Sequence, residues 1–324
     1  MTEEPTVQES RVVVVGAGGL GGYLGSVIHR RDLRVHLVAR GPHLAAIRAT
    51  GLTVLDGGRA ERHSIFASET VPPARPGDVA LVTVKSYALE TVLPDLVRLG
   101  NAGAWIVPLL NGVDSGALLR AGGVPSDRIL QGVAYLTAFR IGPGEIERRG
   151  RHGRLFVGRS NPGAGSATGF LDAVWGALEA EGIEVVETDD IERESWRKML
   201  VVSTLTGACG LLRLPIGAVL ETTTGRGLVA DLLAEASGVA RGLGVGLTEG
   251  DDAEALGVLE AFPFDFRPSL IHDLILGFPT EVEALNGALC RLGSSVGVPT
   301  PAHRGAAEAL REAQRKPPGT FRLG

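Results

Sequence analysis

The chain has 324 residues, enough for two domains with separate cores, and it is 44% hydrophobic and 21% charged, as is usual for a globular protein. Its net charge of −5 offers no basic footprint for nucleic acid, so we expect no nucleic-acid partner. Two cysteines, Cys209 and Cys290, are too few for a disulfide framework and lack metal-ligand spacing, so we also expect no metal site.

From the composition of the N-terminal part of the chain, we do not expect a targeting segment. Its first ten residues, MTEEPTVQES, are acidic and polar, unlike the start of a signal peptide. The longest apolar run, residues 12–28, is rich in glycine and slightly short for a membrane span. We therefore expect a cytoplasmic protein with no membrane partner.

A glycine-rich stretch, RVVVVGAGGLGG, occupies residues 11–22. Its four valines predict a buried parallel strand, and residues 23–30 have the pattern of a helix. The spacing G-x-G-x-x-G is typical of dinucleotide-binding loops, where the glycines allow a tight turn, close approach of a pyrophosphate and close helix–strand packing. The residues predicted to bind the cofactor here are Gly16, Ala17, Gly18, Gly19, Leu20 and Gly21.

A second predicted strand, Arg34–Ala39, completes a βαβ unit, which favours a nucleotide-binding loop over an ordinary strand–turn–helix connection. This strand is followed by Arg40, where an NAD-binding protein would carry an acidic residue. An arginine suits the 2′-phosphate of NADP, so the sequence predicts NADP(H) as cofactor. The alternative is a surface arginine in an arginine-rich chain.

Strands and helices alternate through the first part of the chain, and only helices follow. We expect further strands at 52–55, 64–66, 78–84, 104–110, 128–138, 145–149, 154–158 and 183–187, with helices at 42–50, 87–98 and within 162–181. Later helices are expected at 192–212, 225–242, 251–261, 269–276, 281–296 and 302–314. The predicted fold is an α/β, Rossmann-like parallel-sheet domain over residues 1–188, followed by an all-helical domain over residues 189–324.

Three lysines stand among the 32 basic residues: Lys85, Lys198 and Lys316. Lysine can release its proton when partly buried, whereas arginine cannot, so a retained lysine is a candidate for proton chemistry. Lys85 follows a predicted strand at the edge where α/β sheets bind ligands. Lys198 begins the first helix after the domain boundary and is a candidate proton donor for carbonyl reduction. The alternative for Lys198 is an ordinary exposed lysine.

The chain resembles the ketopantoate reductase (2-dehydropantoate 2-reductase) family through nearly its whole length. The matching features are GAGGLGG at 16–22, Arg40, VKSY at 84–87, LNGV at 110–113, WRKML at 196–200, Ser269 and TEVEALNG at 280–287. Many families share the glycine loop, but the combination of Lys85, Asn111, Lys198 and Glu281 is more specific.

The resemblance implies NADPH-dependent reduction of 2-dehydropantoate to pantoate in pantothenate and coenzyme A biosynthesis. It implies that Lys198 is the general acid and that Glu281 binds substrate and supports the lysine. It also implies that Asn111 positions substrate and contacts the nicotinamide ribose region, that Ser269 holds the substrate carboxylate, and that Lys85 and Arg40 contact the cofactor.

Two of these residues also have simpler explanations. Glu281 could be an acidic residue at a helix N-terminus with Thr280 as the cap, which the helix dipole favours. Asn111 could be a turn residue before Gly112.

The chain departs from the family pattern four and eight residues after Lys198. The family usually has asparagines there that contact substrate, whereas this chain has Val202 and Thr206. Thr206 remains a predicted substrate contact, but a valine cannot form a side-chain hydrogen bond. Because a lost polar contact changes substrate choice, one alternative is a same-fold reductase of a bulkier or more apolar 2-oxo acid. A second, separate alternative is a non-enzymatic NADP sensor that uses the fold as a binding module and needs no proton donor. The oligomeric state is open between a monomer and a homodimer, since apolar helix faces serve either.

Overall fold

A computed structural model of the protein describes residues 10–158, 169–317 and 320–322. The chain divides into two compact units. The first unit comprises Met1–Leu110 and Asp114–Ile191, and the second comprises Asn111–Val113 and Glu192–Gly324. The boundary expected at residue 189 lies close to the division at Ile191, but the sequence pattern did not assign Asn111–Val113 to the second unit.

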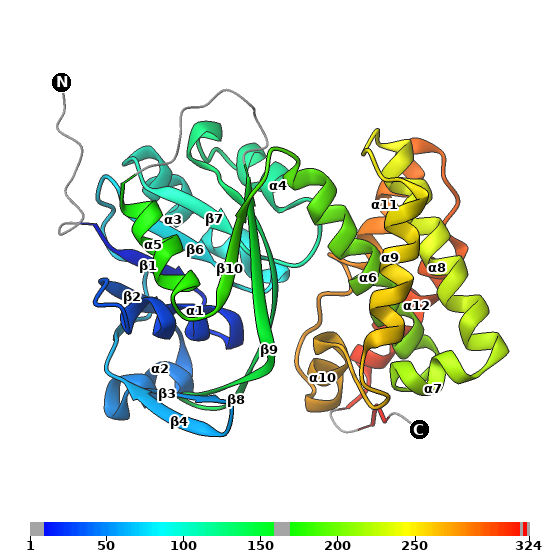
Figure 1. Ribbon diagram of the computed structural model, residues 1–324, viewed down its shortest axis with the longest axis horizontal. Coiled ribbons are helices and arrows are strands. Elements are labelled where there is room, and N and C mark those ends of the chain that lie inside the picture. Colours follow the sequence, from blue (N-terminus) through cyan, green and yellow to red (C-terminus); the bar gives the residue numbers. More distant parts are fainter. Residues whose placement is uncertain (1–9, 159–168, 318–319, 323–324) are drawn as a thin grey trace. The chain divides into compact units, whose positions relative to one another are not determined.

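A five-stranded parallel sheet forms the centre of the first unit (Figure 1). Its order is β5-β2-β1-β6-β7, comprising β1 (Val12–Val15), β2 (Val35–Val38), β5 (Phe66–Ser68), β6 (Val79–Val82) and β7 (Trp105–Pro108). The chain proceeds outward from β1 in one direction through β2 and then in the other through β6. In open α/β sheets such a reversal creates a ligand-binding crevice at the carboxyl ends of the strands.

The valines of β1 explain why this strand is central. Val12 and Val14 pack into one hydrophobic cluster with α1 (Gly19–His29), whereas Val13 and Val15 pack into another with α3 (Leu89–Asn101) and α4 (Ser115–Ala121). All four valines are fully buried. A strand covered on both faces needs a continuous apolar run, which is the pattern that predicted it.

A second sheet in the first unit has the order β10-β9-β3-β4, with β8 paired antiparallel to β9. Its strands are β3 (Leu52–Asp56), β4 (Arg59–His63), β8 (Gln131–Gly142), β9 (Glu145–Gly158) and β10 (Ile183–Glu187). Residues of this sheet share one hydrophobic cluster with α1 and α5 (Phe170–Glu179), and α2 (Gly41–Thr50) follows β2. The Rossmann-like α/β prediction for this part of the chain is confirmed.

Two strands of this second sheet differ from the sequence-based expectation. The predicted strands at 145–149 and 154–158 form one strand, β9, whose pairing with β8 shifts register around Gly150, which has φ +84°. Glycines within a bulge interrupt the alternating pattern without ending the strand. Strand β4 was not expected because four of its five residues are exposed, so it carries no apolar alternation.

Every regular element in the described part of the second unit is a helix. These are α6 (Ile191–Leu212), α7 (Ile216–Glu221), α8 (Thr223–Gly242), α9 (Glu249–Ala261), α10 (Ser269–Leu276), α11 (Asn286–Val296) and α12 (Pro301–Arg315). They surround one core in which Leu200, Cys209, Leu232, Leu289 and Leu310 are fully buried. Both cysteines are free thiols, and burial raises the pKa of Cys209 to about 12, so this thiol stays protonated and unreactive.

The helix expected from Glu281 begins five residues later, at Asn286. The Thr280 N–H donates to Gln314 at 3.0 Å, and the Thr280 hydroxyl bonds to the same side chain. Glu281 therefore lies in the turn before α11 and not in its first helical turn. Its explanation as a helix N-terminal charge capped by Thr280 is wrong.

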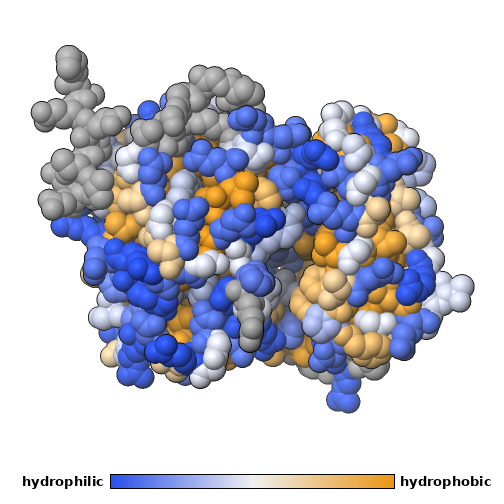
Figure 2. All heavy atoms as spheres, viewed as in Figure 1, coloured by the Kyte–Doolittle hydropathy of each residue, from blue (hydrophilic) through white to orange (hydrophobic). Residues whose placement is uncertain are grey.

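On the face drawn in Figure 2, both hydrophilic side chains and hydrophobic areas are exposed on each unit. Across the described residues, no helix combines enough length and hydrophobicity to cross a bilayer.

Candidate active site

The glycine loop after β1 has a backbone that larger residues would not fit. Gly16 has φ +106°, and a Cβ there would lie 2.7 Å from the Val84 backbone nitrogen. A Cβ on Gly21 would lie 2.2 Å from Thr83 Oγ1. At Gly18, in contrast, an added Cβ would meet no atom within 4 Å. The loop is thus closely packed at its two ends and open at Gly18, where a ligand can approach the backbone.

Hydrogen bonds to residues at the ends of the neighbouring strands β2 and β6 hold this loop in place. The Thr83 hydroxyl donates to the Gly16 carbonyl at 2.8 Å, and the Ala17 N–H donates to the Val38 carbonyl at 2.9 Å. Helix α1 begins at Gly19 with no side-chain cap and no acidic residue in its first turn. Its first N–H groups and the positive end of its dipole are therefore suited to a phosphate.

The predicted cofactor-binding residues of the first unit lie at one edge of the parallel sheet. The glycine loop follows β1, exposed Arg40 follows β2 by two residues, and partly buried Lys85 follows β6 by three. Strands β2, β1 and β6 are neighbours, so these residues lie at adjacent carboxyl ends. Two cationic side chains and an uncapped helix N-terminus thus occupy the edge where α/β sheets bind dinucleotides.

The predicted catalytic residues meet within the second unit. The Asn111 side chain donates from Nδ2 to Glu281 Oε2 at 3.1 Å, and Glu281 is only 4% exposed. Lys198, on α6, is near enough for the Glu281 charge to act on it. Three residues from distant parts of the sequence therefore form one polar cluster, which we call the Lys198 cluster: Asn111, Lys198 and Glu281.

Two opposing effects set the acidity of Lys198. Burial disfavours its charged form and lowers the pKa, while the Glu281 carboxylate raises it, leaving the pKa at about 8 instead of 10.5. At neutral pH the side chain is therefore an ammonium that releases its proton more readily than an ordinary lysine. This is the acidity that a general acid needs near neutral pH.

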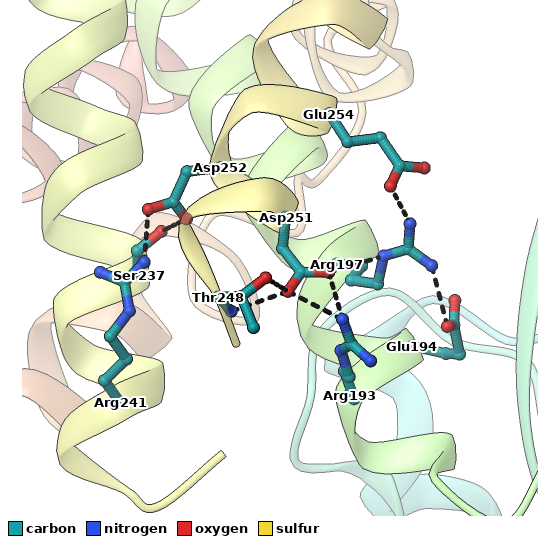
Figure 3. Close-up of polar contacts among 9 residues, drawn as sticks. All are labelled: Arg193, Glu194, Arg197, Ser237, Arg241, Thr248, Asp251, Asp252 and Glu254. Atoms are coloured by element: carbon teal, nitrogen blue, oxygen red, sulfur yellow. Dashed lines mark hydrogen bonds and ion pairs between the residues drawn. The ribbon is translucent and has the colours of Figure 1, made fainter. Parts of the chain in front are cut away.

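An ion-pair network joins α6, at the residue before Lys198, to α9 (Figure 3). Arg193 contacts both carboxylate oxygens of Asp251 at 3.0 Å, and Arg197, next to Lys198, contacts Asp251 at 3.2 Å. Arg197 also pairs with Glu194 at 3.0 Å and with Glu254 of α9. These contacts join α6 to the start of α9 and thereby fix the rotation of the turn bearing Lys198.

Asp251 is the centre of this network. Burial would raise its pKa, but bonds from Thr248 and Arg193 outweigh burial and hold the pKa below its usual value. The Thr248 N–H and hydroxyl donate to Asp251 at 2.7 and 2.9 Å, which also caps the start of α9. The next residue of α9, Asp252, forms a hydrogen bond with Ser237 and an ion pair with Arg241, both on α8.

Helix α10 begins at Ser269, whose side chain is exposed and whose preceding residue, Pro268, provides no cap. Two residues earlier, the Nε of Arg267 is buried and has no hydrogen-bond partner among the described residues. A hydroxyl, a guanidinium and a helix N-terminus are groups that bind a carboxylate. Arg267 was not predicted as a binding residue, because nothing in the sequence distinguishes it from the other arginines of an arginine-rich chain.

Thr206 does not face the Lys198 cluster as a free hydrogen-bonding group. It is 1% exposed, and its hydroxyl donates to the Val202 carbonyl at 2.7 Å, one turn earlier in α6. It also lies 3.3 Å from Asn286 Oδ1, which belongs to a buried network with His303. The hydroxyl proton is used inside the unit, so a substrate contact by Thr206, which stays a prediction, would require its hydroxyl to act as an acceptor. Val202 is partly buried against the helical core.

Possible metal ligands and a surface hollow are two further features of the described residues, outside the glycine loop and the Lys198 cluster. No group of three or more His, Cys, Asp or Glu side chains is arranged to hold a metal ion within residues 10–158, 169–317 and 320–322. A surface hollow of about 820 Å³ lies in the first unit at the amino ends of β1 and β2, lined in part by Arg11, Arg34 and Phe66. It is at the sheet edge opposite the glycine loop.

The first unit has a doubly wound sheet with a glycine-rich loop, and the helical second unit carries a lysine with a lowered pKa. This is the architecture of a nicotinamide-dependent oxidoreductase acting on a CH–OH group. Comparison with known proteins agrees and identifies the family. A family model described as ketopantoate reductase PanE/ApbA matches residues 12–162, and its C-terminal counterpart matches residues 190–314. The chain belongs to the ketopantoate reductase family.

Similar proteins cover nearly the full length of the chain. The 2-dehydropantoate 2-reductase of Halobacterium salinarum is 32% identical over 309 residues, covering 94% of this chain and 99% of the relative. The structure of 2-dehydropantoate 2-reductase from Geobacter metallireducens is 27% identical, with a TM-score of 0.83 and coverage of 94% and 99%. D-mandelate dehydrogenase, solved with NADH and anilino(oxo)acetate, shares the fold at 24% identity, with a TM-score of 0.85 and coverage of 94% and 98%.

We expect Asp251→Asn to destabilise the protein by about 2 kcal/mol at neutral pH, because it removes a charge-assisted contact to two arginines. The folded-state pKa of Asp251 is lowered, so its contribution is present above the unfolded value of 3.8 and is lost as pH falls through the lower folded value. Urea unfolding at pH 7 and pH 3 measures this difference. Glu254→Gln, at the exposed end of the network, is the matched control and should cost under about 0.5 kcal/mol. Equal losses in the two variants would contradict the central role of Asp251.

Proposed function

We propose that this protein catalyses the NADPH-dependent reduction of a 2-oxo acid, with 2-dehydropantoate to pantoate as the leading reaction. The observation that carries the proposal is the Lys198 cluster, in which a lysine with a pKa of about 8 lies beside a buried glutamate. The names of the relatives from Halobacterium salinarum and Geobacter metallireducens support the substrate.

The first unit fits a dinucleotide, which supplies the hydride when bound. Gly16 and Gly21 allow the close packing that shapes the loop, Gly18 leaves its backbone open, and the uncapped start of α1 offers N–H groups to the pyrophosphate. Arg40 and Lys85 add positive charge at the neighbouring strand ends.

In the proposed mechanism, the residues of the second unit complete the reduction. As hydride reaches the carbonyl carbon, Lys198 Nζ gives its proton to the ketone oxygen, which becomes the hydroxyl of a 2-hydroxy acid. Glu281 keeps Lys198 protonated near neutral pH, and Asn111 holds the Glu281 carboxylate by a hydrogen bond. Ser269, Arg267 and the start of α10 bind the substrate carboxylate.

The decisive experiment is a screen of NADPH and NADH oxidation with 2-dehydropantoate and several related 2-oxo acids. We expect the fastest oxidation with NADPH. If no 2-oxo acid supports oxidation of either dinucleotide while both bind, the protein would instead be a cofactor sensor, which needs no proton donor.

The pH dependence follows from the acidity of Lys198. Because the ammonium is the acid, kcat/KM for reduction should be constant below about pH 8 and fall about tenfold per pH unit above it. Lys198→Met should lower kcat by at least about a hundredfold and leave the Kd for NADPH unchanged. Lys316→Met, at an exposed lysine paired with Glu312, is the control and should retain full activity. A flat profile to pH 9.5 would contradict the assignment.

The preference for NADPH rests on Arg40. We expect Arg40→Glu to raise KM for NADPH at least about tenfold while changing KM for NADH little, because the introduced carboxylate repels the 2′-phosphate. Arg34→Glu makes the same charge change at the opposite end of β2 and is the control. Steady-state kinetics with both dinucleotides measures the ratio. An unchanged ratio in Arg40→Glu would place the 2′-phosphate elsewhere.

A second candidate is a reductase of a more apolar 2-oxo acid, which the apolar side chain of Val202 one turn after Lys198 favours. The two candidates differ in whether the 4-hydroxyl of 2-dehydropantoate is recognised. The second predicts equal or better kcat/KM with 3,3-dimethyl-2-oxobutanoate, which lacks this hydroxyl, and Val202→Asn should then shift preference toward 2-dehydropantoate by about tenfold or more. A strong preference of the unmodified protein for 2-dehydropantoate would rule this candidate out.

A further inference from the structure

A buried histidine joins the glycine loop to a distant hairpin of the first unit. His43, in the first turn of α2, is 5% exposed. Its Nε2 lies 2.7 Å from the Ala17 carbonyl in the glycine loop. Its Nδ1 lies 2.9 Å from the backbone nitrogen of Gly144, in the turn between β8 and β9.

These two contacts define the protonation state of His43. The Gly144 N–H can only donate, so Nδ1 must carry the lone pair that accepts it. Nε2 then carries the proton and donates to the Ala17 carbonyl. Burial lowers the pKa of His43 below its ordinary value, which agrees with a neutral ring that uses one nitrogen as donor and the other as acceptor.

The connection made by His43 reaches the parts of the first unit that the cofactor needs. Ala17 lies between Gly16 and Gly18 in the loop, and α2 begins directly after Arg40. The β8–β9 hairpin also packs on the loop directly, since a Cβ on Gly19 would lie 2.1 Å from the Ala138 carbonyl of β8. The hairpin, the loop and the start of α2 therefore form one packed assembly, and the His43 ring is its polar link.

The bond at Ala17 also sets the direction of the loop backbone. The Ala17–Gly18 peptide is thereby held at both of its polar groups, because the Gly18 N–H donates to the Gly16 carbonyl at 2.7 Å. Gly18 is the position where the loop is open. A loop whose backbone is fixed before binding loses less entropy when it takes up a ligand.

We propose that His43 is a positioning residue that orders the glycine loop for the dinucleotide by holding the Ala17 carbonyl against the β8–β9 turn. The inference rests on the proposed function, since it assumes that the loop binds NADP(H). It assigns a role to a residue that touches neither the substrate nor the reacting atoms.

The test compares NADPH binding in His43→Phe, His43→Gln and His36→Phe. Phenylalanine keeps the ring but removes both hydrogen bonds, so the Kd for NADPH should rise at least tenfold. Glutamine keeps an amide donor for the Ala17 carbonyl and should restore affinity to within about threefold of the unmodified protein. His36 is the matched control, because it is a buried histidine of the same unit that bonds to Ser68 and not to the loop. His36→Phe should leave the Kd unchanged.

Kinetics adds a readout that a general loss of stability would not produce. With His43→Phe we expect a higher KM for NADPH, with kcat at saturating NADPH and KM for the 2-oxo acid both unchanged. An unchanged Kd in His43→Phe, or an equal loss of affinity in His36→Phe, would overturn the inference. If His43→Phe does not fold, a His43→Gln variant that binds NADPH tenfold more weakly would also overturn it. Failure of the unmodified protein to bind either dinucleotide would instead contradict the proposed function.

Discussion

Two opposing electrostatic effects act on one lysine, and the proposed chemistry depends on their balance. Burial makes the Lys198 ammonium costly, whereas the nearby Glu281 carboxylate stabilises it, and the outcome is a pKa of about 8. The two effects act in opposite directions: without the carboxylate the pKa of Lys198 would be lower still, and without burial it would be higher. Asn111 takes part by donating to the buried carboxylate, because an unsatisfied buried charge is strongly unfavourable.

A balance of this kind requires rigid surroundings, and the second unit provides them through its helices. The ion pairs from Arg193 and Arg197 to Asp251 fix α6 against α9, and the hydroxyl of Thr206 bonds back to the same helix. Two other hydroxyls of α6, those of Ser203 and Thr204, are buried and have no hydrogen-bond partner among the described residues. Val202 remains as an apolar neighbour on the helix, which is why the identity of the 2-oxo acid is the question that kinetics must answer.

The first unit has a different requirement, which is a loop whose backbone is accessible to an anionic ligand. Its glycines permit a conformation that side chains would block, and its strands and the His43 ring hold that conformation from outside the loop. The glycine motif was recognisable in the sequence because the loop conformation requires residues without side chains at fixed, nearby positions. The supporting contacts from Thr83 and His43 could not be predicted from the sequence, because a single threonine or histidine forms no motif or periodic pattern that would indicate its tertiary partner.

The sequence by itself determined the fold class, the order of most elements and the family, because apolar periodicity and short motifs are local properties. It also predicted Lys198, Glu281 and Asn111 as site residues, through a resemblance spread over nearly the whole chain. Tertiary structure decided what these residues contact: Asn111 belongs to the second unit, Glu281 precedes α11, and Thr206 points inward. The physical reason is that a hydrogen bond or a pKa depends on groups far apart in the chain, and no local pattern records which of them fold together.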